Sequence, residues 1–323
     1  MQEGTNTQEP RTEVSIPSAV ESIHETVNSI VRINWHGWQD CYLMSNGSLE
    51  AIVVPAIGRV MQLRLAGDST GTLWENRALD GRLHQAGHHQ WRNFGGDKCW
   101  PAPQSAWPVN LGCAWPPPIA FDSLPAEVNV KRHEVILRSP VDAAMGIQVV
   151  RHVALDPVRS VMRIRTEFRK LLGSPVTVSI WTITQMQEPE RICALLPANS
   201  KFDRGYTPLL NAEPAGLKIH DRLLSLIRHP NAYVKIGVDA ASLAWVGSNC
   251  VVRIEAEVGP GEYPDGGCIT QIYTNPDPLH YVELETLGPL TKMSVGDRIE
   301  RTTVYAVTPR TTPDPEAEAL KVF

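Results

Sequence analysis

Hydrophobic and polar residues alternate along most of the chain from about Trp35 onward. Short alternating runs rich in Val, Ile, Thr and Tyr, and bounded by Gly, Pro or Asn, are typical of β-strands. The Asn46-Gly47 pair between two such runs predicts a tight hairpin. Strands are predicted at residues 41–45, 49–54, 59–65, 127–131, 135–138, 146–155, 161–168, 176–185, 217–219, 223–227, 233–238, 243–246, 251–258, 268–273, 281–286 and 298–307.

Helical spacing is found in the N-terminal region, and the Pro- and acid-rich tail at residues 310–323 is expected to hold one helical turn. Ser18 and Glu21 match a capping box, and apolar residues from Val20 to Val31 recur at helical intervals. Many short strands with almost no helix predict an all-β fold, either a sandwich or a barrel. The sequence is therefore expected to form an N-terminal arm with a short helix, one β-sandwich domain and a C-terminal tail, at residues 1–34, 35–308 and 309–323.

The composition narrows the class of protein. The chain has 323 residues, of which 42% are hydrophobic and 20% charged, as in an ordinary globular protein. A net charge of −5 without a Lys/Arg block argues against nucleic acid and anionic membranes as partners. No apolar run is long enough to predict a membrane span. The polar N-terminus lacks the apolar core of a secretory signal, so we expect a cytoplasmic protein, with a mature exported form as the alternative.

The six cysteines are scattered and include no C-x-x-C pair. Free buried thiols in a reducing compartment are the simplest interpretation. Gly67-Asp68-Ser69-Thr70-Gly71 matches the G-x-S-x-G pattern of hydrolases, but that motif needs a strand–elbow–helix setting, so we interpret it as a turn.

The segment Asn93–Gln104, NFGGDKCWPAPQ, is the most informative part of the chain. It is too polar for a core strand, so we expect a surface loop with a functional role. A flat aromatic face beside hydrogen-bonding groups suits a sugar ring, because its C–H face stacks on the aromatic and its hydroxyls need donors and acceptors. A loop-stabilising ion pair is the alternative interpretation of Asp97 and Lys98. We expect Trp100 to stack on the sugar and the polar groups to orient its hydroxyls, namely Arg92, Asn93, Asp97, Lys98 and Gln104.

A second candidate group is the pair Glu283 and Glu285. The two residues lie two apart in a predicted strand, so their side chains share one face. Two neighbouring carboxylates with separated pKa values could act as an acid and a base. The alternative is the polar outer face of an ordinary strand.

Three segments resemble galactose-mutarotase-like proteins, the superfamily of the aldose-1-epimerases. Leu49–Leu65 has the strand, Pro, Gly turn and strand with which those proteins open, and Tyr281–Leu290 is similar to their late strand with the catalytic Glu. Asn93–Gln104 resembles a bacterial branch of the superfamily. The resemblance in pattern covers roughly residues 35–308. It implies a large antiparallel sandwich, the supersandwich, with a sugar-binding groove on one sheet and no metal or organic cofactor.

In the epimerases a Glu acts as the base on the anomeric hydroxyl and a His protonates the ring oxygen. The resemblance implies that Glu285 is the base, with Glu283 as its rival. The His is expected in the strand that contains Trp181, but none is present, so Trp181 is interpreted as a binding residue. His88 and His89 are the candidates for the acid.

The sequence therefore supports three hypotheses. The first is an epimerase or related isomerase that acts at the anomeric centre of a sugar. The second is a non-catalytic carbohydrate-binding module, and the third is a polysaccharide lyase or hydrolase using the same groove. The partner in each case is a sugar or an oligosaccharide, and the oligomeric state is left open. All three hypotheses require Asn93–Gln104 and the strand with Glu283 and Glu285 to meet over one hollow.

Overall fold

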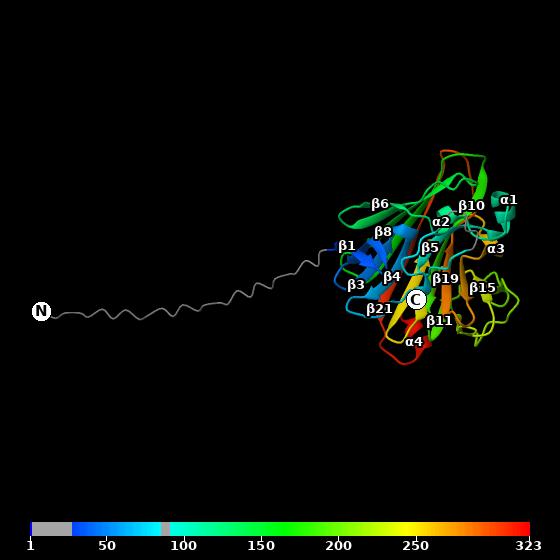
Figure 1. Ribbon diagram of the computed structural model, residues 1–323. Coiled ribbons are helices and arrows are strands. Elements are labelled where there is room, and N and C mark those ends of the chain that lie inside the picture. Colours follow the sequence, from blue (N-terminus) through cyan, green and yellow to red (C-terminus); the bar gives the residue numbers. More distant parts are fainter. Residues whose placement is uncertain (2–27, 85–90) are drawn as a thin grey trace.

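Two large antiparallel sheets form the body of the protein (Figure 1). The computed structural model describes Met1 and residues 28–84 and 91–323. Within this part of the chain the sheets have 11 and 10 strands, and the helices are short. The prediction of an all-β sandwich is confirmed. No helix among these residues is long and apolar enough to cross a membrane.

The first sheet carries the candidate site. Its strands, in spatial order, are β1 (Ser29–Trp35), β2 (Trp38–Ser45), β3 (Leu49–Val54), β4 (Arg59–Leu65), β5 (Asp97–Ala102), β10 (Val176–Gln187), β19 (Tyr281–Leu287), β18 (Thr270–Thr274), β15 (Val234–Val238) and β12 (Thr207–Pro208). A further short strand, β20 (Thr291–Met293), pairs with the start of β10.

The second sheet packs against the first and completes the sandwich. Its strands, in spatial order, are β13 (Lys218–His220), β14 (Leu223–Leu226), β11 (Arg191–Leu195), β16 (Ser242–Val246), β17 (Cys250–Ala256), β21 (Arg298–Pro309), β9 (Val161–Lys170), β8 (Ile147–Leu155), β7 (Glu134–Arg138) and β6 (Glu127–Val130). The helical segments of the described chain are η1 (Pro55–Ile57), η2 (Arg77–Leu79), η3 (Gln104–Ala106), α1 (Trp107–Leu111), α2 (Ile119–Asp122), α3 (Pro264–Gly267) and α4 (Pro315–Leu320).

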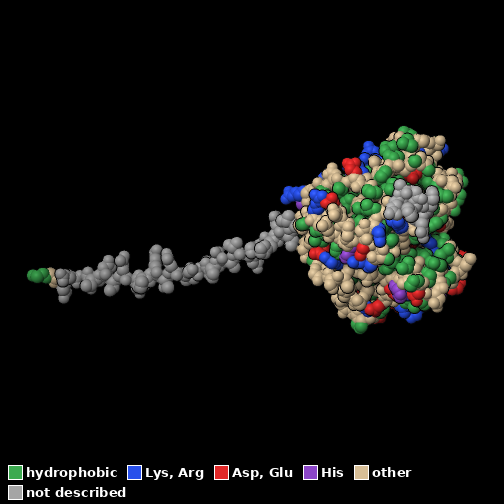
Figure 2. Space-filling view, viewed as in Figure 1, with side chains coloured by type: hydrophobic (Ala, Val, Ile, Leu, Met, Phe, Trp, Pro, Cys, Tyr) green, Lys and Arg blue, Asp and Glu red, His purple; other side chains and the backbone are tan. Residues whose placement is uncertain are grey.

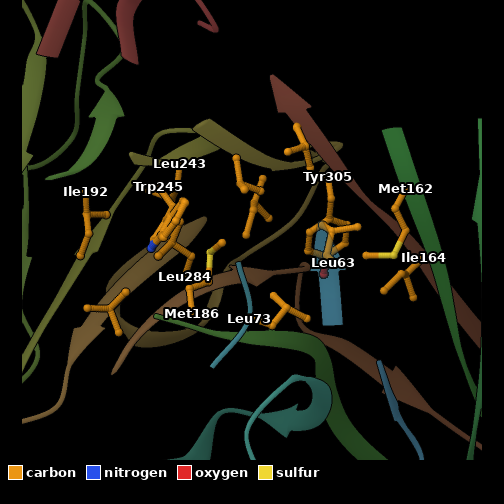
Figure 3. Packing of buried hydrophobic residues seen from close by; sticks show 14 of the residues in the cluster. Leu63, Leu73, Met162, Ile164, Met186, Ile192, Leu243, Trp245, Leu284 and Tyr305 are labelled. Carbon is orange, nitrogen blue, oxygen red and sulfur yellow. The ribbon is translucent and has the colours of Figure 1, made fainter. Parts of the chain in front are cut away.

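Side chains from the facing surfaces of both sheets fill the space between them (Figure 3). Leu63 and Leu284 from the first sheet and Ile164 from the second belong to one buried cluster. Because successive strand residues point to opposite faces, the residues that alternate with this set in the first sheet point away from the sandwich core. The central strands therefore present their remaining side chains on an outer face.

The predicted strands are present with shifts of a few residues at their ends. The hairpin at Asn46-Gly47 is confirmed, since Asn46 Oδ1 accepts the backbone N–H groups of Ser48 and Leu49 at 3.0 and 2.7 Å. Strands β1, β5, β11, β12 and β20 are absent from the prediction. The predicted helix is wrong where it can be compared, because Ile30 and Val31 lie in β1; the rest of it lies outside the described residues.

The expectation of a surface loop at Asn93–Gln104 is also wrong. Residues 97–102 form β5, which pairs with β10 over its whole length in the middle of the first sheet. A strand of this polarity is stable there because its charged side chains find partners on both faces. The prediction of free thiols holds for all six cysteines, of which Cys113 is exposed rather than buried.

Candidate functional site

Strands β5, β10 and β19 lie side by side, so two segments far apart in sequence meet. Trp181 of β10 pairs with Trp100 of β5, and Gln185 of β10 pairs with Glu283 of β19. Lys98 Nζ and Glu283 Oε1 are 3.5 Å apart across β10. The expectation that these segments meet is confirmed.

The outer face of these strands forms a hollow that we call the aromatic groove. It is a cavity of about 480 Å³. Its lining consists of aromatic rings, amides, charged groups and a short apolar loop, contributed by Trp91, Asn93, Trp100, Gln104, Trp115, Trp181, Leu210, Tyr233, Lys235, Tyr273, Asn275, Asp277, Pro278, Leu279, Tyr281 and Glu283. In the view of Figure 2, hydrophobic side chains gather over the part of the sheet that holds β15 and β19.

Tryptophans form one wall of the aromatic groove. The ring centroid of Trp100 lies 5.5 Å from that of Trp181 and 6.0 Å from that of Trp115, both edge-to-face. Trp100 Nε1 donates to Asp122 Oδ1 at 3.0 Å, and Arg59 Nη2 donates to the same oxygen at 2.7 Å. The fully buried Arg59–Asp122 pair therefore fixes the orientation of the Trp100 ring.

The two glycines before β5 allow the chain to reach the sheet. Gly95 and Gly96 have φ values of +94° and +70°. A Cβ on Gly95 would lie 2.2 Å from the carbonyl oxygen of Trp74, and one on Gly96 would lie 2.5 Å from that of Val60. Only glycine fits both positions. The Gly-Gly pair thus sets the entry of β5 into the sheet and the placement of Lys98 and Trp100 after it.

Two ion pairs lie on the floor of the aromatic groove. Glu283 lines the groove and is paired with the fully buried Lys98. Lys235 also lines the groove, and its Nζ is 3.0 Å from Oε2 of the fully buried Glu285. In each pair, one charged group faces the groove and the opposite charge lies buried against it.

The buried members of both pairs have shifted pKa values. Burial raises the pKa of Glu285 to about 7, against the opposing effect of Lys235. Burial lowers the pKa of Lys98, against the opposing effect of Glu283. Trp181 Nε1 donates to Glu285 Oε2 at 2.7 Å, and Gln185 Nε2 donates to Glu283 Oε1 at 2.8 Å. Both shifts favour the neutral form of the group, as expected where a charge is removed from water.

Several buried polar atoms at this face have no hydrogen-bond partner among the described residues. They are Trp91 Nε1, Asn93 Oδ1, Gln185 Oε1, Gln271 Oε1, Lys98 Nζ and Glu285 Oε1. Buried polar groups in folded proteins are otherwise almost always bonded. Such a concentration on one face indicates groups available to a ligand or to water.

The predicted binding residues divide between the groove and other places. Asn93, Trp100, Gln104 and Trp181 line the groove. Lys98 lies against its floor and forms a cation–π contact with Trp100, with Nζ 5.0 Å from the ring centroid. Three other tryptophans differ in their placement, since Trp107 is fully buried whereas Trp91 and Trp115 line the groove.

The structure corrects the placement of Asp97. This residue points into the space between the sheets, where Arg151 donates to Oδ1, and Thr184 and Tyr305 donate to Oδ2 at 2.7 and 2.5 Å. It faces away from the groove because it alternates with Lys98 along β5. Its expected contact with sugar hydroxyls is therefore wrong.

Arg92 is not part of the groove lining. Arg92 lines a separate hollow beside Leu83 and donates to the Leu83 carbonyl oxygen at 2.6 Å. His88 and His89 lie outside the described residues. Across the described chain, no three His, Cys, Asp or Glu side chains converge as metal ligands would.

The sequence analysis did not single out Lys235, Tyr273 or Gln271. Tyr273 pairs with Glu283, Gln271 pairs with Glu285, and Lys235 pairs with Tyr273, so all three share the face of the two glutamates. The alternation of polar residues in the predicted strands 233–238 and 268–273 was the available signal. Assigning it to this face required the order of the strands in the sheet, which the sequence does not provide.

Solved structures described as galactose mutarotase-like proteins have a fold similar to that of this chain. A galactose mutarotase-like protein from Lactobacillus casei ATCC 334 is similar with a TM-score of 0.55 at 9% identity, over 83% of this chain and 100% of that chain. A galactose mutarotase related enzyme from Lactobacillus acidophilus gives a TM-score of 0.55 at 9% identity, over 85% and 99%. The fold implied by the sequence resemblance is confirmed.

A larger protein contains a similar unit. A TPR-domain containing protein from Parabacteroides distasonis ATCC 8503 gives a TM-score of 0.58 at 10% identity, over 85% of this chain and 48% of that chain. This chain thus spans about half the length of that protein. No family model and no curated protein matches the sequence. At these identities the likeness shows a shared fold, and the chemistry has to be argued from the residues.

Proposed function

We propose that this protein binds a sugar in the aromatic groove and accelerates the interconversion of its anomers by acid–base catalysis. The observation that carries the proposal is the arrangement of the two ion pairs. Glu283 and Lys235 place a carboxylate and an ammonium group in one aromatic-lined groove, and each is held by a buried opposite charge. Opening and closing of a sugar ring requires an acid and a base that face one site.

The aromatic and polar parts of the groove suit the two surfaces of a sugar. Trp115 is 47% exposed at the groove and offers a ring face to C–H groups. Asn93 and Gln104 supply amide groups for hydroxyls. A cavity of about 480 Å³ lies within the usual range of small-ligand sites. These features support a sugar as the ligand class.

In the proposed reaction, Glu283 removes the proton from the anomeric hydroxyl. The electron pair forms the carbonyl bond at C1, the bond between C1 and the ring oxygen breaks, and Lys235 gives a proton to that oxygen. Rotation about the bond between C1 and C2 and the reverse proton transfers then close the ring as the other anomer. Glu283 is preferred to Glu285 as the base because Glu283 lines the groove whereas Glu285 is fully buried.

The remaining charged residues position the reacting groups. Lys98 Nζ lies 3.5 Å from Glu283 Oε1, and Glu285 Oε2 lies 3.0 Å from Lys235 Nζ, so each reacting group has a buried neighbour that fixes its position. Trp181 Nε1 donates a hydrogen bond to Glu285, and Lys235 Nζ lies over the Trp181 ring, 4.5 Å from its centroid. Trp181 stands in the strand where the epimerases have their acid, so the proposal assigns that role to Lys235.

The test is the rate of anomer interconversion for a panel of aldoses, followed through the anomeric proton signals by NMR. The wild-type protein is expected to exceed the buffer rate for at least one sugar, and Glu283→Gln is expected to lose about 100-fold or more of that acceleration. Glu300→Gln is the matched control, because Glu300 is an exposed carboxylate on β21 of the other sheet. Lack of acceleration for every aldose would contradict the enzymatic proposal.

A non-catalytic carbohydrate-binding module is the second candidate. The absence of a histidine from β10 favours it, since the side chains there are Trp181 and Thr182. Two results together would select this function over catalysis. The protein would bind a sugar saturably without accelerating anomer interconversion, and Glu283→Gln would leave the affinity unchanged.

A further inference from the structure

A second cavity adjoins the aromatic groove and has its own aromatic and charged groups. Its volume is about 610 Å³, and Pro278 and Leu279 line both hollows. Trp74 lines the second cavity and Tyr281 lines the groove, and their ring centroids are 4.5 Å apart. One loop and one aromatic pair therefore separate two neighbouring binding spaces.

The second cavity repeats the pairing of a tryptophan with a buried carboxylate. Trp35 Nε1 donates to Glu75 Oε1 at 2.8 Å, as Trp181 Nε1 donates to Glu285 Oε2 at 2.7 Å beneath the groove. Burial raises the pKa of Glu75 to about 7, as it does for Glu285. Both spaces also combine tryptophan rings with a lining carboxyl group that can hydrogen-bond to hydroxyls, which is Glu75 in the second cavity and Glu283 in the groove.

The charges in the second cavity are balanced. Arg64 pairs with Glu50 at 2.8 Å, and Arg77 pairs with Asp80 at 2.9 Å. Burial, reinforced by Arg77, lowers the pKa of His36, which favours its neutral form. A phosphate or carboxylate would have to compete with carboxylates already bound to both arginines. A neutral ligand rich in hydroxyl groups fits this cavity better.

We propose that the second cavity binds a further ring of a neutral oligosaccharide whose reducing end occupies the aromatic groove. The proposal rests on the proposed function, because it takes the groove as the site of the anomeric carbon. Two adjoining spaces, each with a tryptophan and a carboxyl group, match the repeating pattern of a glycan chain. The ligand class is then an oligosaccharide of at least two rings rather than a free monosaccharide.

The experiment compares glucose and galactose with maltotriose, cellotriose and β-1,4-galactotriose. Binding is followed by the indole N–H signals of Trp35 and Trp181 in 15N NMR spectra of the full chain, assigned by Trp→Phe variants. At least one trisaccharide is expected to shift both signals and to bind about tenfold or more tightly than its monosaccharide, whereas the monosaccharide shifts the Trp181 signal alone. Trp35→Ala and Glu75→Gln are expected to remove this tenfold advantage and to leave monosaccharide binding and its anomer interconversion unchanged.

The outcomes separate this inference from the proposed function. Equal affinity for monosaccharides and trisaccharides, or trisaccharide affinity unchanged in both folded variants, overturns the second subsite while the groove chemistry stands. Tighter binding of trigalacturonate than of galactotriose overturns the assignment of a neutral ligand. A trisaccharide that shifts the Trp35 signal without any acceleration at its reducing end supports the subsite and contradicts catalysis. Because Glu75→Gln keeps the size of the side chain, it tests the site even if Trp35→Ala does not fold.

Discussion

Asp97 and Lys98 are neighbours on β5, and their side chains point to opposite faces of the first sheet. On the inner face, both carboxylate oxygens of Asp97 accept hydrogen bonds, from Arg151, Thr184 and Tyr305. On the outer face, Lys98 Nζ has an ion-pair contact with Glu283 but no hydrogen-bond partner among the described residues. Both side chains are fully buried.

The difference in hydrogen bonding between the two faces distinguishes a structural role from a functional one. A buried charge with every bond satisfied holds the fold together, because losing one partner leaves the other uncompensated. A buried charge with unsatisfied bonds costs stability and is kept where a ligand or a reaction uses it. By this comparison the inner face is structural, and the outer face is the candidate site.

The largest expected effect on stability is at the inner face. Asp97→Ala leaves the buried Arg151 without its carboxylate, so we expect the free energy of unfolding to fall by about 3–5 kcal/mol. Urea denaturation measures this change. Glu283→Gln, the counterpart on the outer face, is expected to stay within about 1 kcal/mol of the wild type. Equal losses for the two variants would remove the distinction between the faces.

The second prediction concerns the pH dependence of stability. The pKa of Glu285 is about 7 in the folded protein and about 4.5 in the unfolded chain, so the folded state holds the proton more tightly. The stabilisation is complete below pH 4.5 and is lost as the pH rises through 7. In the wild type this group is expected to lower the free energy of unfolding by about 3 kcal/mol at most between pH 5 and 8. Glu285→Gln is expected to remove this decrease.

The control for this measurement is Glu300→Gln, which alters an exposed carboxylate on β21. Its pH dependence is expected to match the wild type. If the stability of Glu285→Gln varied with pH as it does in the wild type and in Glu300→Gln, Glu285 would be ionised throughout this range. Lys235 would then outweigh the effect of burial.

The third prediction tests the outer face with Lys98→Met. Replacing a buried ammonium group that lacks hydrogen bonds with an apolar side chain of similar length is expected to leave stability unchanged or to raise it by about 1 kcal/mol. The same change removes the ammonium group 3.5 Å from Glu283 Oε1, so the anomeric acceleration is expected to fall about tenfold or more. A loss of stability like that of Asp97→Ala would place Lys98 among the structural residues. Lys98→Arg, which keeps the charge, is the companion variant.

Most of the fold could be predicted from the sequence, because alternation and turn residues act locally. Asn46-Gly47 and the Pro55–Arg59 turn each specify their own hairpin. Strand β5 was missed for a physical reason: Asp97 and Lys98 look too polar for a core strand until Arg151 and Glu283, distant in sequence, are placed beside them. Polarity along the chain does not reveal such partners.

The candidate site was predictable only in part. Trp100 and the two glutamates stand out by composition, and their shared face follows from strand geometry. The assignment of Asp97 to the groove failed because the alternation of β5 was not recognised, and alternation fixes which neighbour faces the groove. Lys235 was missed because its contact with Glu285 depends on the order of β19, β18 and β15, which is set by tertiary packing.

The smallest expected effect is at the rim of the outer face. Trp115 is 47% exposed and packs against Trp91, with ring centroids 5.1 Å apart. Trp115→Ala is expected to weaken sugar binding about fivefold, since a stacked aromatic contributes roughly 1 kcal/mol, with little change in thermal stability. Trp107→Ala is the contrasting variant, because Trp107 is fully buried and donates to the Pro101 carbonyl oxygen at 2.8 Å, so its loss is expected to cost about 3–5 kcal/mol of stability. If Trp115→Ala left sugar affinity unchanged, the stacking surface would have to lie deeper, on Trp100 or Trp181, and the ligand would enter the groove edge-on.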